Sequence, residues 1–86
     1  SKAFEGLVSA LTEKTDWARL ETAYRNRIKK LEGGKPEELA VLWDALGELL
    51  KHRLNRVSDA VEAFEKAQKL EPESRRRAEQ LADIYA

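Results

Sequence analysis

A set of apolar and small side chains in the middle of the sequence recurs on both sides of it, and this recurrence narrows the available folds more than any other feature. The central set is Trp43, Leu46, Gly47 and Leu50. The upstream set, 39 residues earlier, is Phe4, Leu7, Val8 and Leu11. The downstream set, 35 residues later, is Ala78, Leu81, Ala82 and Tyr85. Periods of this length are typical of stacked structural units, each of which buries its apolar face against the next.

Each set lies in a segment whose apolar residues are three or four positions apart, which is the spacing of one helix face. The sequence predicts five such helices, the first at about 2–14 and the last at about 74–86. The breaks that separate them are at 15–16, 33–34, 55–58 and 71–73. Asp16 and Ser58 offer side-chain caps to the helices that follow them. Because the breaks are short, consecutive helices should be antiparallel neighbours, and we predict an all-α fold.

The central set continues on the following helix. There, the small and aromatic residues are Ala60, Phe64 and Ala67, and the unit closes at Pro72. This arrangement resembles the tetratricopeptide repeat, which carries an aromatic residue, Leu and Gly on its first helix and Ala, an aromatic residue and Ala on its second. The resemblance implies antiparallel helical hairpins stacked as a short right-handed α-solenoid of five helices in a single domain. The implied repeats are about 1–35, about 36–73 and a final half-repeat or capping helix at about 74–86.

The same pattern predicts how the helices pack. Small residues let neighbouring helices approach closely, and bulky residues fill the spaces between them. The small residues expected at these contacts are Gly47, Ala60, Ala67 and Ala82. The aromatic residues expected in the core are Trp17, Tyr24, Trp43, Phe64 and Tyr85.

The resemblance also implies a function, because tetratricopeptide arrays bind peptides or partner helices on a concave face formed by the first helices of successive repeats. The residues expected on that face are Lys2, Glu5, Ser9, Thr12, Val41, Asp44, Glu48, Lys51, Arg76, Glu79 and Asp83. Its centre is acidic, through Asp44, Glu48 and Asp83, and its margins are basic. We therefore expect a non-catalytic scaffold for protein–protein interaction, with a basic or amphipathic protein or peptide partner.

Composition argues against other classes of function. A single histidine, His52, and the absence of cysteine leave no histidine metal pair, Ser-His relay or thiolate site, so we expect no catalytic residue, metal or cofactor. Sixteen acidic and sixteen basic residues balance, which is unlike a nucleic-acid binder. No segment approaches the ~20 apolar residues of a membrane helix, so we expect no membrane partner.

Three consecutive arginines at 75–77 are not explained by the helix dipole, because they open a helix instead of ending one. Glu71 and Glu73, or acidic groups of a partner, would offset their charge.

Two other interpretations stay open. Leu81, Ile84 and Tyr85, if uncovered, would let the last helix pair two chains in a homodimer, which makes structural self-assembly the alternative function. An engineered repeat protein is the other interpretation, although the insertion of two glycines and Arg27 in place of Ala are irregular for a design. The sequence also holds no methionine, and we expect it to be a piece of a longer protein.

Overall fold

The computed structural model describes residues 2–85, apart from the side chain of Arg76, and shows five helices and no strand in that range. The helices are α1 (Lys2–Glu13), α2 (Trp17–Lys30), α3 (Pro36–His52), α4 (Val57–Leu70) and α5 (Arg75–Tyr85). The prediction of an all-α chain of five helices is confirmed. Residue 86, the expected end of the last helix, lies outside the described range.

The helix ends follow local sequence signals with one exception. Asp16 caps α2, since its side chain accepts a hydrogen bond from the backbone N–H of Arg19 at 3.3 Å. Gly33 follows α2 at φ 82°, a conformation that favours glycine and stops the helix. The expected cap at Ser58 is wrong, because Asn55 at φ 55° turns the chain earlier and α4 already begins at Val57.

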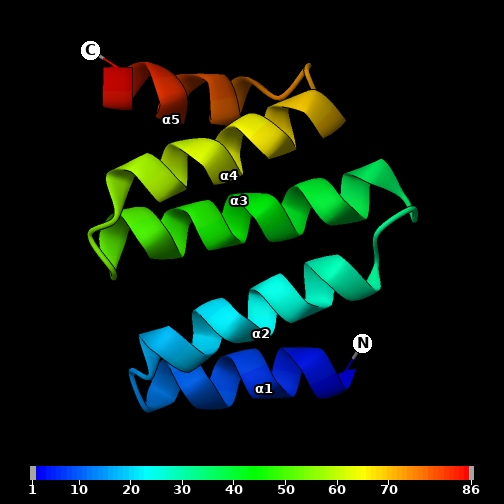
Figure 1. Cartoon of the computed structure of the whole chain (residues 1–86), viewed down its shortest axis with the longest axis vertical. Helices are drawn as coiled ribbons and strands as arrows, with labels where there is room; N and C mark the ends of the chain where they lie inside the picture. The colour runs from blue at the N-terminus through cyan, green and yellow to red at the C-terminus, as the bar shows by residue number, and fades with distance from the viewer. Residues whose placement is uncertain (1, 86) are drawn as a thin grey trace.

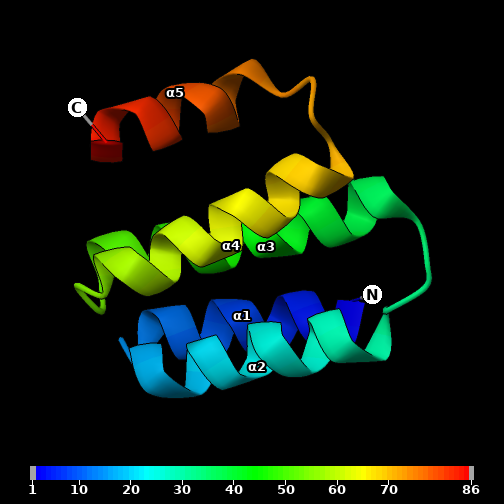
Figure 2. The same cartoon turned by 45° about the horizontal axis from the view of Figure 1, so that its top comes forward.

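Successive helices lie side by side and run in opposite directions (Figure 1). Turning the molecule by 45° brings α1 and α2 to one level and α3 and α4 to the next, with α5 beyond them (Figure 2). The chain is therefore two antiparallel hairpins followed by a single helix. The contact between α3 and α4 is the most extensive, and α2 joins the first hairpin to α3.

The α3–α4 contact depends on a glycine. Phe64 of α4 is 0% exposed, and a Cβ atom added at Gly47 of α3 would lie 2.6 Å from its ring. Ala60 and Ala67 of α4 are likewise fully buried, so the predicted packing of small against bulky residues is present here. Ala82 of α5 is exposed instead, because no described helix covers the outer face of α5.

The aromatic residues occupy three different environments. Phe64 is buried in the core, whereas Trp17, Tyr24 and Trp43 are half-buried at its margin. The prediction that Tyr85 belongs to the core is wrong, since it is 63% exposed. Its hydroxyl donates to Oε2 of Glu65 of α4 at 3.1 Å, so the side chain links the C-terminal end of α5 to α4.

Two glycine-to-alanine substitutions should change stability in opposite directions. Gly47→Ala forces the ring of Phe64 to move, and we expect a net loss of about 1–2 kcal/mol after the gain in helix propensity. Gly6→Ala in α1 should stabilise the chain by about 0.5–1 kcal/mol, since a Cβ there meets nothing within 4 Å. Urea unfolding measures both. A shift of the two midpoints in the same direction would show that Gly47 is not needed for the close approach of α3 and α4.

Candidate functional site

A groove opens between α1 and α3, with α2 behind it. Both helices pack against α2 and make little contact with each other, so the space between them stays open. Its volume is about 730 Å³, within the range of pockets that hold small ligands or anchor side chains. The lining residues of this α1–α3 groove are Phe4, Glu5, Val8, Ser9, Tyr24, Arg27, Leu31, Glu37, Glu38, Val41, Leu42 and Ala45.

The interior of the groove is apolar and partly aromatic. Phe4 of α1 contacts Tyr24 of α2 edge-on, with ring centroids 5.7 Å apart. The guanidinium of Arg27 of α2 lies over the ring of Phe4, 5.4 Å from its centroid. Burial raises the pKa of the Tyr24 hydroxyl above its usual value. Val41 on the α3 wall is 64% exposed, which leaves apolar surface accessible at the opening.

Three carboxylates surround the opening at the end where α1 and α3 begin. Glu5 lies in the first turn of α1, and Glu37 and Glu38 lie in the first turn of α3. All three are exposed. The helix dipole favours acidic residues at these positions. None of the three makes an ion pair with a side chain that the structure describes.

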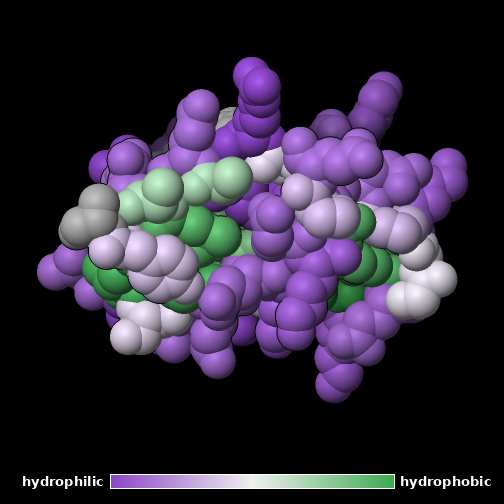
Figure 3. Space-filling model, turned by 90° about the horizontal axis from the view of Figure 1, so that it is seen from above, coloured by the Kyte–Doolittle hydropathy of each residue, from purple (hydrophilic) through white to green (hydrophobic). Residues whose placement is uncertain are grey.

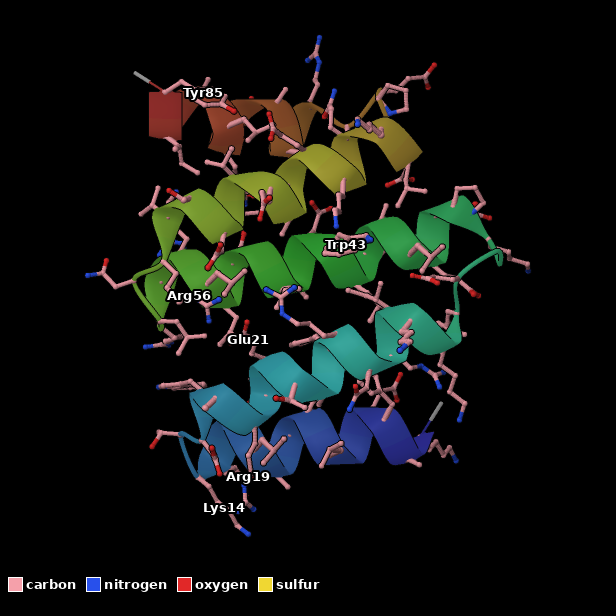
Figure 4. The ribbon with its side chains drawn as sticks, in the orientation of Figure 1. Lys14, Arg19, Glu21, Trp43, Arg56 and Tyr85 are labelled. Atoms are coloured by element: carbon pink, nitrogen blue, oxygen red, sulfur yellow. The ribbon has the colours of Figure 1, made fainter. Side chains whose placement is uncertain are left out.

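At the opposite end of the hairpins, polar contacts hold the two hairpins together. Glu21 of α2 binds Arg56, the residue before α4, with 2.7 Å between Oε1 and Nη1 (Figure 4). Arg56 also binds Asp59 at 2.7 Å, and the guanidinium of Arg53 lies 5.0 Å from the ring centroid of Trp17. We call these contacts the Glu21–Arg56 clamp. The groove therefore opens at the end of the molecule away from the clamp.

Two of the three residues of the acidic centre predicted from the sequence, Asp44 and Glu48, are bound by side chains of α5. Arg77 is 2% exposed, and its Nε and Nη2 donate to the two carboxylate oxygens of Asp44 at 2.6 and 2.5 Å. Its Nη1 donates to the backbone carbonyl of Glu71 at 2.7 Å. The hydrogen bonds to Asp44 raise the pKa of Arg77, which keeps the guanidinium charged. Gln80 of α5 donates to Oε1 of Glu48.

These contacts account for one of the three arginines at the start of α5. The charge of Arg77 is met inside the chain by Asp44 and by Glu71, whose carboxylate lies 3.5 Å from Nη2. A partner is not needed to neutralise it.

The predicted face is thus divided. Glu5, Ser9 and Val41 line the α1–α3 groove, whereas Asp44 and Glu48 contact α5. The predicted residues that do not line the groove or make these contacts are Lys2, Thr12, Lys51, Glu79 and Asp83. Arg76 lies in α5, and its side chain is outside the described part of the structure.

Sequence reasoning missed the contribution of α2, which supplies Tyr24, Arg27 and Leu31, and that of Glu37 and Glu38. The repeat pattern assigns the concave face to first helices alone. The sequence carried one signal that the first two hairpins are spaced differently from the rest. The first period is 39 residues, against 35 for the second, and its extra length includes two glycines between α2 and α3.

Comparison with known proteins finds no relative of this chain. The chain matches no protein-family model, and no similar chain is found among curated proteins or solved structures. Within residues 2–85, no helix is both long and apolar enough to cross a membrane. Nor do three or more acidic or histidine side chains gather there in a way that could hold a metal ion.

Proposed function

We propose that this chain is a non-catalytic module for protein–protein interaction, which binds a peptide or a partner helix in the α1–α3 groove. The observation that carries the proposal is an open apolar groove between the first helices of two successive hairpins. We further propose a tetratricopeptide-like α-solenoid as its architecture, with repeats at about 1–35 and 36–73 and a half-repeat or capping helix at about 74–86.

The packing of the hairpins supports this architecture. Gly47 admits Phe64, and Ala60 and Ala67 are buried beside it, as the repeat pattern requires. The two hairpins occupy successive levels, followed by α5 (Figure 2). Helices α1 and α3 then correspond to the first helices of their repeats, and the groove lies between them.

The chemistry of the groove supports binding over catalysis. Its lining combines aliphatic and aromatic side chains with carboxylates and one guanidinium, and it contains neither histidine nor cysteine. Accessible apolar surface beside a charged edge suits an amphipathic protein segment. The partner that we propose is therefore a protein or peptide of basic or amphipathic character, and not a nucleic acid or a membrane.

Placing a charge in the groove should weaken binding. Val41→Asp puts a carboxylate against the apolar part of the partner, and we expect about a tenfold loss of affinity for an amphipathic helical peptide. Chemical-shift mapping by NMR with the same peptide should show the largest changes in the lining residues. The matched control is Val57→Asp on α4, which is also exposed but outside the groove. Equal losses in the two variants, or changes that centre on α5, would rule out the groove as the binding site.

The alternative function is self-assembly through α5. The outer surface of the molecule near the C-terminal end of α5 shows apolar side chains among hydrophilic ones (Figure 3). On α5, Ala78, Ala82 and Tyr85 are exposed and Leu81 and Ile84 are half-buried. Sedimentation equilibrium distinguishes the two functions, since a chain that stays monomeric at high concentration does not pair through α5.

A further inference from the structure

We propose that the partner in the α1–α3 groove is a cationic amphipathic helix, which places aliphatic side chains in the groove and lysine or arginine side chains against Glu5, Glu37 and Glu38. This inference rests on the proposed function and adds the chemistry and orientation of the partner. It also differs from the sequence-based expectation, which centred the acidic contact on Asp44 and Glu48.

The first argument is the distribution of uncommitted charge. Asp44 is held by Arg77, and Glu48 accepts a hydrogen bond from Gln80, so a ligand would have to displace α5 to reach them. Glu5, Glu37 and Glu38 are exposed and make no ion pair with the described side chains. The accessible acidic groups of the groove therefore lie at the end where α1 and α3 begin.

The second argument is the net charge of the lining. The lining contains three carboxylates and one guanidinium, that of Arg27, so its net charge is −2. Arg27 is half-buried behind the opening, where its guanidinium lies over the ring of Phe4. A partner that approaches from solvent meets the exposed carboxylates first, and complementary charge both attracts and orients it.

The third argument is that helix stability alone does not explain the site. The helix dipole accounts for acidic residues in first turns. It does not require an apolar groove beside them, or a valine that is 64% exposed at its wall. The apolar surface of Val8, Val41 and Leu42 lies next to the carboxylates along the same helices.

This arrangement specifies how the aliphatic and cationic residues are spaced along the partner helix. Residues four positions apart share one face of a helix. Two aliphatic residues at that spacing fit along the groove, and cations one and two turns further reach the end of the groove that carries Glu37 and Glu38. A helix with its cations at its C-terminus also satisfies its own dipole.

The test uses fluorescence anisotropy with a labelled helical peptide of about 16 residues, long enough for partial helicity. The peptide carries two leucines four positions apart and two lysines beyond them. A second peptide has glutamate in place of lysine, and a third has serine in place of leucine. We expect the first peptide to bind, and the other two to bind at least about tenfold more weakly.

The chain variants locate the effect. Glu5→Gln, Glu37→Gln and Glu38→Gln combined should weaken binding of the lysine peptide by about tenfold, because its two lysines lose all of their exposed carboxylate partners. The matched control combines Glu13→Gln, Glu62→Gln and Glu73→Gln, which makes the same change of net charge at exposed glutamates outside the groove. The control should change affinity by less than about twofold, and circular dichroism should show both variants folded.

The outcomes separate the inference from the proposed function. If both triple variants behave alike, or if the lysine and glutamate peptides bind equally, the cationic partner is refuted. The proposed function survives that result provided that Val41→Asp still weakens binding. If none of the peptides binds, or if Val41→Asp leaves peptide binding unchanged, both proposals fail.

Discussion

Phe64→Ala is expected to destabilise the chain by about 3–5 kcal/mol, because a fully buried aromatic side chain is removed and the cavity closes only partly. A domain of this length has a free energy of unfolding of roughly 4–13 kcal/mol, so the loss is a large share of it. Phe64 contacts Gly47 across the most extensive helix pair of the molecule, so the substitution weakens the whole of the second hairpin. Urea unfolding followed by circular dichroism measures the change.

Tyr85→Ala is the matched control, since Tyr85 is the exposed aromatic residue of α5. It should lose its hydrogen bond to Glu65 and leave the unfolding midpoint almost unchanged. If both substitutions lowered the midpoint equally, Tyr85 would have to be covered in solution, which would favour self-assembly through α5.

Asp44→Ala should release α5 from the rest of the chain. The substitution leaves the buried guanidinium of Arg77 without its bidentate acceptor. Because Asp44 is partly exposed and Arg77 keeps its bonds to Glu71, we expect a loss of about 1–3 kcal/mol, below that of a fully buried ion pair. Because α5 packs mainly against α4 and is joined to α3 through the described side chains of Arg77 and Gln80, the helix can separate before the core unfolds. Native-state hydrogen exchange should therefore show loss of protection in α5, with α3 and α4 protected as before.

Two variants check this mechanism. Asp83→Ala removes an exposed aspartate of α5 that has no described ion pair, and it should leave the exchange of α5 unchanged. Replacing the pair by Asp44→Leu and Arg77→Met together should restore protection, because an apolar pair of similar size can substitute for a buried ion pair. Unchanged protection of α5 in Asp44→Ala alone would mean that other contacts hold the helix.

Local structure could be predicted from the sequence because its causes are local. The three-to-four spacing of apolar residues places the five helices, and the cap at Asp16 and the stop at Gly33 are confirmed. The contact between Gly47 and Phe64 could also be predicted, since both residues follow a recurring pattern within one hairpin.

The lining of the groove could be predicted only in part, through Glu5, Ser9 and Val41, because the spacing of residues along a helix does not say how far apart two hairpins lie. The repeat pattern predicted that Asp44 and Glu48 lie on a concave face open to a partner, whereas the structure places both in contact with α5. It could not indicate that Arg77, 33 residues further along the chain, would bind Asp44 first. Side-chain pairing between distant helices depends on tertiary geometry, and only that geometry shows which carboxylates stay available.

The Glu21–Arg56 clamp and the connection at 31–35 tie α2 to the second hairpin at opposite ends. Helix α3 has 17 residues and so spans about 25 Å, with the clamp near one end and Glu37 at the other. Dissolved ions weaken exposed ion pairs but leave the covalent connection intact. Raised ionic strength should therefore loosen the two hairpins at the clamp end first, about 25 Å from the carboxylates of the groove.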